Sequence, residues 1–377
     1  MEHLCGEALA PDQGAQVFLR IKEGGLGLSS AECAREAAFL GSWGLNLKDA
    51  AVCVVASSWE GFRAKCGPVT EAIDRAEASM MLKGPADMAA VDWVGLIGDP
   101  LSKLQGHWSD KLHRQRCTAL RGMLGQDDRV DLGSAGGPGP GGFLQVPVDI
   151  EGVKSARMPD QHFIVMLKDR LRLPVCPEGR HCQHRNAQGV PCMAPLDARG
   201  KHALKCEWGP ARTARHDSLR DFTARNHQRV TGHVAIKEQR VTAWDRVNPR
   251  TGDREEARLD VATRDAVDGR RVFVDTTVTC AHSDYEPRQR ARADKCGLAA
   301  SQAVDAKRLR YPPSGGELVP LAFEAGGRPA EETVSFVRSW GFGLEGAERS
   351  DEIRFAWQQY SNLLQAGNAE AILSAIG

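Results

Sequence analysis

Asp260 and Asp275 are a candidate pair of metal ligands, because each lies in a segment that alternates between apolar and polar residues. An Asp268-Gly269 dipeptide stands between the two segments, and this arrangement is the strongest short-range signal for a β-hairpin. With the dipeptide as the turn, Ala262 lies opposite Asp275. Asp260 then lies one diagonal step from Asp275 on the same face. Such neighbours have Cβ atoms about 7 Å apart or less, so both carboxylates could reach one cation.

The chemistry of such a pair is phosphodiester hydrolysis. Mg²⁺ is held by one or two carboxylates together with phosphate oxygens, and it stabilises the charge that develops on the scissile phosphate. The plain alternative is that both aspartates face water, since exposed acids are common. A third acid, Glu238, lies in a segment that could form the adjacent strand, where it could orient the metal's water shell or be a solvated edge residue. The opposite face of the hairpin is predicted to be core and carries Leu259, Val261, Val272, Val274 and Val278.

A cysteine- and histidine-rich segment predicts a second metal site, of the structural zinc type. Its ligands are soft or borderline, as tetrahedral zinc requires, and the segment is polar, so it lacks the apolar side chains to order itself without a metal. The alternative is that the cysteines are free thiols in a reducing compartment. Cys176 and His184 stay open as alternative ligands. The predicted zinc ligands, spaced C-x9-C-x9-H-x3-C, are Cys182, Cys192, His202 and Cys206.

Basic residues gather around this segment although the whole chain is neutral, with 49 basic and 49 acidic side chains. Between Lys168 and Arg229 there are 13 lysines and arginines against six acids, a net charge of 13 − 6 = +7. Such a local excess favours contact with a phosphate backbone. For the part from Arg212 to Arg229 alone, a plain solvated helix face is an equally good interpretation.

The elements that must position these residues follow from periodicity and chain breakers. Apolar residues at three- and four-residue steps predict helices before residue 125, and the Gly/Pro-rich run 133–142 predicts a linker. We expect an α/β fold with a small mixed sheet flanked by helices, a zinc knuckle and a separate N-terminal helical domain. The expected later elements are helices at 158–173, 212–229 and 287–310, β-structure at 234–279, a strand at 318–323, and helices from 330 and 351. The expected domains are 1–130 (helical), 131–148 (linker), 149–210 (helix and knuckle), 211–345 (core) and 346–377 (C-terminal helix).

The composition predicts a globular intracellular protein. With 377 residues and 42% hydrophobic content, the chain is long enough for two or three packed domains. Eleven cysteines are too few and too scattered for a secreted disulfide scaffold, and the first residues do not form a signal peptide. No apolar run approaches the roughly 20 residues of a membrane-spanning helix. We therefore expect a nuclear or cytoplasmic location.

The order of these motifs resembles the restriction-enzyme-like endonuclease of early-branching, site-specific non-LTR retrotransposons, which belongs to the PD-(D/E)XK nuclease class. The resemblance covers residues 170–340 and implies that Asp260 and Asp275 bind Mg²⁺, with Glu238 as an auxiliary acid. It further implies that Lys307 is the positively charged residue of the motif, moved from the strand to a neighbouring helix, where it stabilises the charge on the phosphate. A Mg²⁺-dependent DNA nickase with a structural zinc is the implied activity. DNA is the implied partner, with RNA as the further option. The residues expected to contact the substrate are Arg215, His216, Arg220 and Tyr311.

Two departures from the family pattern affect this expectation. Leu259 stands at the position of the motif proline, which does no chemistry, and Thr277 stands at the position of the motif lysine. Catalysis then depends on Lys307, or on Lys295, reaching the site. The segment 18–28 is also similar to the part that follows the palm of a reverse transcriptase, but no Tyr-x-Asp-Asp motif occurs, so no polymerase activity is expected. The alternative is a catalytically inactive, transposon-derived zinc protein that binds nucleic acid.

Overall fold

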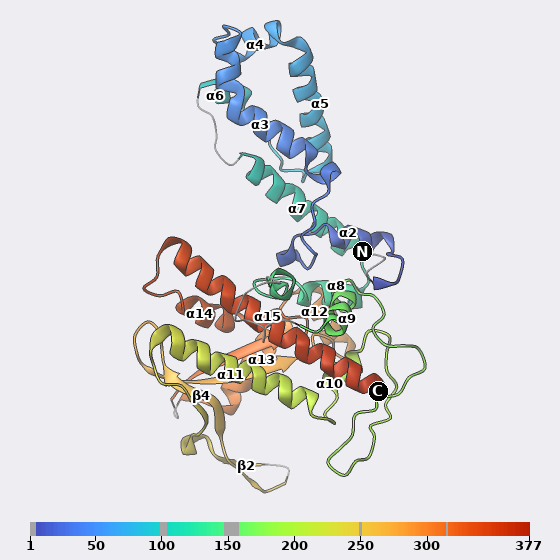
Figure 1. The fold of residues 1–377 in the computed structure, drawn as a ribbon, viewed down its shortest axis with the longest axis vertical. Helices are drawn as coiled ribbons and strands as arrows, with labels where there is room; N and C mark the ends of the chain where they lie inside the picture. The colour runs from blue at the N-terminus through green and yellow to red at the C-terminus, as the bar shows by residue number, and fades with distance from the viewer. Residues whose placement is uncertain (1–4, 99–103, 147–157, 249–250, 314–315) are drawn as a thin grey trace. The chain divides into compact units, whose positions relative to one another are not determined.

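The computed structural model describes residues 5–98, 104–146, 158–248, 251–313 and 316–377. The chain divides into two compact units (Figure 1). One unit comprises Val17–Arg20 and Gly27–Met123, and the other comprises Met1–Gln16, Ile21–Leu26 and Leu124–Gly377. We call them the helical unit and the sheet unit. Within the described residues, no helix combines the length and the apolar character needed to cross a membrane.

The helical unit is held together by an apolar core with aromatic stacking. The Trp59 ring stacks on Trp93 with centroids 5.5 Å apart and on Phe62 with centroids 5.9 Å apart. Aromatic side chains bury large apolar areas, so these rings supply much of the stabilising burial. The helices of the helical unit are α3 (Ala31–Cys53), α4 (Trp59–Lys65), α5 (Gly67–Lys83), α6 (Trp93–Gly98) and α7 (Leu104–Met123).

A four-stranded mixed sheet lies at the centre of the sheet unit, in the order β1-β4-β5-β6. The pairs β1–β4 and β4–β5 are antiparallel, whereas β5 and β6 are parallel. The expected α/β fold with a small mixed sheet is confirmed at this level. The strands are β1 (Ile236–Arg240), β4 (Arg258–Arg264), β5 (Arg271–Thr279) and β6 (Glu317–Glu324), and β2 (Arg246–Val247) and β3 (Arg254–Glu255) form a separate ribbon.

Helices α12 (Glu286–Asp294) and α13 (Leu298–Arg310) connect β5 to β6. A connection of this length is required because parallel neighbours cannot be joined by a tight turn. One continuous helical segment was expected here. The structure breaks it at Gly297, whose φ of +80° lies in the left-handed region that favours glycine. The break gives α13 its own direction and brings its last turn to the sheet.

Three helices pack against the sheet through a shared aromatic core (Figure 1). They are α11 (Ala211–Thr231), α14 (Glu331–Ser339) and α15 (Gly346–Ile376). Phe222 lies on α11, Trp340 caps the C-terminal end of α14 and Tyr360 lies on α15. The Trp340 and Tyr360 rings stack with centroids 6.0 Å apart. This core fixes α11 over the strands that carry the two aspartates.

The Gly/Pro-rich run is packed rather than extended, contrary to its prediction as a linker. Phe143 N–H donates to Ser361 Oγ on α15 (3.0 Å), and Ser361 Oγ donates to the Pro140 carbonyl (2.9 Å). A Cβ built on Gly142 would lie 2.8 Å from the Trp357 carbonyl, so the close approach requires glycine. The two units meet in sequence at Met123 and Leu124, before the run. The remaining elements of the sheet unit are α2 (Pro11–Val17), η1 (Ile21–Glu23), α8 (Gln126–Ser134), η2 (Gly142–Gln145), α9 (Asp160–Arg170), α10 (Lys201–Lys205) and η4 (Thr242–Trp244).

Candidate active site and metal centre

The hairpin between β4 and β5 has a different register from the predicted one. Ala262 pairs with Phe273, not with Asp275, because the loop contains six residues, 265–270, instead of two. The Asp265 carboxylate closes this loop by accepting a hydrogen bond from the backbone N–H of Val267 (2.8 Å). The prediction of a two-residue turn did not include this contact. The shift amounts to two residues. An even shift keeps every side chain on its predicted face.

The new register brings Asp260 and Asp275 to directly facing positions, one step beyond the Val261–Val274 pair. At this step the regular ladder stops, and the Thr276 N–H donates to Asp260 Oδ2 instead (2.6 Å). Asp260 is 6% exposed and Asp275 is 4% exposed. The two predicted metal ligands are therefore buried neighbours on the central strands of the sheet.

Lys307, on the last turn of α13, lies at this pair. Its Nζ is 2.7 Å from Asp275 Oδ2, so the ammonium forms an ion pair with this buried oxygen. Burial raises the pKa of Asp275, and the Asp260 carboxylate adds to this, against the opposing charge of Lys307. Burial alone would lower the pKa of Lys307, but the Asp275 carboxylate outweighs it, and the net direction is upward. Lys295, the other predicted candidate, is exposed.

His216, on α11, contacts the other aspartate. Its Nε2 lies 3.1 Å from Asp260 Oδ2, and its Nδ1 lies 3.4 Å from Asp217 Oδ1. The hydrogen bond to Asp260 raises the pKa of His216, although burial opposes the shift. His216 was expected to contact the substrate. In the structure it contacts the candidate metal ligand.

Glu238 lies opposite Asp260 in the pairing of β1 with β4, between the Lys237–Val261 and Gln239–Leu259 pairs. Its φ is +54°, which is uncommon for any residue other than glycine. The Glu238 carboxylate accepts a hydrogen bond from Arg220 Nη1 at 2.5 Å, and the side chain is 48% exposed. Glu238 thus neighbours the aspartate pair in the sheet, but its carboxylate is directed to α11.

The other residues expected to contact the substrate have varied surroundings. Arg215 is 4% exposed and donates to Asn368 Oδ1 on α15 (2.5 Å), so it is not available to a ligand at the surface. Arg220 pairs with Asp217, Asp221 and Glu238 at 3.1 Å or less. Tyr311 caps α13 and packs on Trp244 with centroids 5.3 Å apart. Burial raises the pKa of Tyr311, and the nearby Asp275 contributes.

The four predicted zinc ligands form one compact cluster. The ligand atoms of Cys182, Cys192, His202 and Cys206 all lie within 4.8 Å of one another. Cys182 Sγ is 3.8 Å from Cys206 Sγ, and Cys192 Sγ is 3.5 Å from His202 Nε2. A tetrahedral ion with Zn–S bonds of about 2.3 Å separates its sulfur ligands by about 3.8 Å, so the spacing fits. This cluster, which we call the Cys₃His cluster, could hold a zinc-like ion.

The alternative ligands lie outside the Cys₃His cluster. His184 Nε2 is 3.0 Å from Ser374 Oγ on α15, and the Gln183 N–H donates to the Ala375 carbonyl (2.9 Å). Cys176 is buried but is not among the clustered ligands. The last turns of α15 therefore pack on the segment that carries the cluster.

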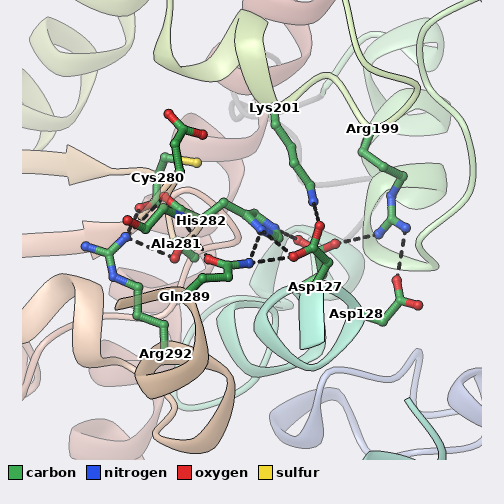
Figure 2. Close-up of polar contacts among 12 residues, drawn as sticks. Asp127, Asp128, Arg199, Lys201, Cys280, Ala281, His282, Gln289 and Arg292 are labelled. Carbon is green, nitrogen blue, oxygen red and sulfur yellow. Dashed lines mark hydrogen bonds and ion pairs between the residues drawn. The ribbon is translucent and has the colours of Figure 1, made fainter. Parts of the chain in front are cut away.

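Much of the predicted basic surface is neutralised inside the sheet unit. Figure 2 shows Lys201 pointing toward Asp127 and Arg199 toward Asp128, with distances of 3.0 and 3.2 Å. Asp131 also pairs with Arg199 (2.7 Å). These ion pairs join the segment that carries the Cys₃His cluster to α8. Two further arginines in the count of 13, Arg170 and Arg172, are buried.

Two groups in the site were not identified from the sequence. Asp217 contacts His216 and Arg220, and the backbone N–H of Thr276 contacts Asp260. Asp217 could have been suspected because it follows His216 in the sequence. The N–H of Thr276 could not, because every residue except proline has a backbone N–H. In comparisons with known proteins, no family model and no curated protein matches the chain.

Proposed function

We propose that the chain is a Mg²⁺-dependent DNA endonuclease that nicks DNA, of the non-LTR retrotransposon type, with Asp260, Asp275 and Lys307 at its active site. The observation that carries the proposal is the pair of buried, directly facing aspartates with the Lys307 ammonium 2.7 Å from Asp275. Burying two carboxylates side by side is unfavourable unless a cation or a proton compensates them. The order of motifs along the chain, which resembles that nuclease family, supports the same activity.

Asp260 and Asp275 would hold the magnesium ion. The fit is supported by the chemistry of the donor set, which is a pair of facing carboxylates that are 6% and 4% exposed. A bound Mg²⁺ would supply charge stabilisation to the phosphate and activate the attacking water. Lys307 would place a fixed positive charge beside the developing charge on the phosphate, which a lysine at this position can do without any rearrangement of the backbone.

The Cys₃His cluster would bind zinc in a structural role. All four positions are occupied by protein ligands, whereas a catalytic zinc keeps one position open for water or substrate. His202 and Cys206 belong to the short α10 region, and α11 begins five residues after Cys206. A zinc ion would thus order the segment that leads into the helix carrying His216.

A second candidate function is that of an inactive, nucleic-acid-binding zinc protein. It is favoured because the Cys₃His cluster offers all four ligands of a structural zinc site, whereas the aspartate site offers only two carboxylates. The segment that carries the cluster also resembles a zinc knuckle. Cleavage separates the two candidates. The inactive protein would bind DNA without any metal-dependent nicking.

The test is relaxation of supercoiled plasmid DNA by the purified chain with and without Mg²⁺. We expect nicking with Mg²⁺ and its loss in Asp275→Ala. A metal ligand contributes several kcal/mol to catalysis, which at about 1.4 kcal/mol per factor of ten is on the order of a thousandfold in rate. Asp305→Ala, which removes an exposed carboxylate from α13, is the matched control and should nick normally. Nicking that survives Asp275→Ala would exclude this active site, and DNA binding without nicking would favour the second candidate.

A further inference from the structure

We infer that His216 is a positioning residue, which holds one oxygen of Asp260 so that the other oxygen is left for the metal ion. The inference rests on the proposed function and adds a role for residues on α11. Two groups converge on Asp260 Oδ2: the Thr276 N–H donates to it at 2.6 Å, and His216 Nε2 lies 3.1 Å from it, within ion-pair distance. With Oδ2 occupied from both sides, Oδ1 is the oxygen that remains to bind a cation.

The imidazole is itself held in place by a chain of polar contacts. Its Nδ1 faces Asp217 Oδ1 at 3.4 Å, and Arg220 Nη1 lies 3.0 Å from the same Asp217 oxygen. Arg220 in turn bonds Glu238 at 2.5 Å. This series of contacts runs from Glu238 on edge strand β1, across α11, to Asp260 on β4. It therefore links two residues that already lie opposite each other in the sheet. Side chains held by such networks lose little freedom when a ligand binds.

The backbone of Glu238 supports this interpretation. Its positive φ costs free energy in a residue with a Cβ, and such strained residues gather at functional sites. The conformation directs the Glu238 carboxylate to Arg220. The auxiliary acid expected at the metal therefore acts at the far end of the chain of contacts, through Arg220, Asp217 and His216.

Hydrogen-bonded partners of metal ligands typically change metal affinity by about 10- to 100-fold when they are removed. We expect His216→Leu to raise the Mg²⁺ concentration for half-maximal nicking by about this factor, with the rate recovering at high Mg²⁺. His216→Gln keeps an N–H donor of similar reach and should stay within a few-fold of the wild type. Ser218→Ala, which removes a half-buried hydroxyl that bonds the Ala214 carbonyl of the same helix, should have no effect.

A merely structural role for His216 would lower thermal stability in both variants without moving the metal dependence. Direct binding of Mn²⁺, followed by electron paramagnetic resonance, separates the possible failures. If the wild type binds Mn²⁺, Asp275→Ala abolishes the binding and His216→Leu leaves it unchanged, the role of His216 is overturned while the active site stands. If the wild type neither binds Mn²⁺ nor nicks DNA, the proposed function falls and the inference falls with it. Failure of His216→Gln to restore the affinity would also overturn the hydrogen-bonding role.

Discussion

The Cys₃His cluster and the aspartate pair are two candidate metal sites that the chain assembles in opposite ways. The cluster draws all its ligands from the 25 residues between Cys182 and Cys206. The aspartate pair needs two strands, and its neighbours Lys307 and His216 come from helices on either side of the hairpin in sequence. A local site depends on ligand spacing, whereas a dispersed site depends on the whole topology.

The two sites also differ in how the protein compensates their charge. The Asp275 carboxylate is compensated by Lys307 at 2.7 Å, so this site can fold before any ion binds. In the Cys₃His cluster the sulfurs contact one another and His202, and backbone N–H groups of His184 and Trp208 bond Cys182 and Cys206. None of these contacts brings a lysine or arginine to the sulfurs. We therefore expect the aspartate pair to be preformed and the cluster segment to depend on its ion for order.

Zinc removal should give the largest effect and tests this contrast directly. Structural zinc sites contribute apparent binding free energies of about 10–16 kcal/mol in isolated peptides, so stripping the ion should disorder the segment around the ligands. The last turns of α15 should lose protection as well, because Gln183 and His184 bond Ala375 and Ser374 there. Hydrogen exchange over residues 176–206 and 369–376 is the measurement, with removal of Mg²⁺ alone as the control.

Two cysteine variants test whether the zinc binds at the Cys₃His cluster. Cys206→Ser should lower the zinc content well below one per chain, whereas Cys176→Ser should keep one zinc, because Cys176 lies outside the cluster. A chain purified without zinc and with unchanged exchange would contradict the claim that the segment requires the ion.

How much of each site was predictable follows from the same difference. The clustering of Cys182, Cys192, His202 and Cys206 was predicted correctly, because residues close in sequence cannot be far apart in space. The register of the aspartate pair was wrong by two residues, because Asp265 forms a longer loop than the Asp268-Gly269 signal suggested. The predicted faces of the strand side chains were still correct, because side chains alternate with a period of two and the register shifted by two residues.

The fold itself was predictable where periodicity is strong and less so where packing decides. Helix α11 and strand β6 were expected close to their observed positions. The Gly/Pro-rich run was expected to be a linker, and nothing in its composition indicates that α15 packs on it. Likewise, the burial of Arg215 against Asn368 depends on a helix about 150 residues away in sequence. Long-range packing of this kind is absent from local patterns.

Lys307→Met tests the preformed nature of the aspartate pair, with the second-largest effect. Leaving Asp275 without its counter-charge should destabilise the fold by about 1–3 kcal/mol, less than for a fully buried ion pair because the Lys307 side chain is 28% exposed. Nicking should fall on the order of a hundredfold. Thermal unfolding should also show that Mg²⁺ stabilises this variant more than the wild type, because the ion replaces the missing charge.

Lys295→Met is the matched control, since Lys295 is exposed at the end of α12. It should change neither stability nor nicking. If Lys307→Met unfolds at the wild-type temperature without Mg²⁺, the lysine does not compensate the aspartates, and the contrast between the two metal sites is lost.

The smallest effect concerns the aromatic core that α11, α14 and α15 share beside the aspartate strands, through His227 near the end of α11. Trp340 Nε1 donates to His227 Nδ1 (3.0 Å), and His227 Nε2 donates to the Arg264 carbonyl (2.8 Å), which is the arrangement of a neutral imidazole. Burial lowers the pKa of His227 below its ordinary value of 6.5. Because the folded pKa is depressed, this contribution to stability is complete above about pH 6.5 and is lost as the pH falls toward the folded pKa.

His227→Leu should remove this acid sensitivity, at a cost of about 1–3 kcal/mol at neutral pH from the unpaired Trp340 N–H. The measurement is the free energy of unfolding between pH 7.5 and about 5, compared between wild type and variant. His216 titrates in the opposite sense, since its pKa is raised and its contribution is lost as the pH rises, so only the difference between the two proteins isolates His227. His107→Gln, an exposed histidine of the helical unit, should leave the profile unchanged. Equal acid sensitivity in wild type and His227→Leu would mean that the shared core does not respond to acid, and any loss of nicking at low pH would then originate in one of the two sites.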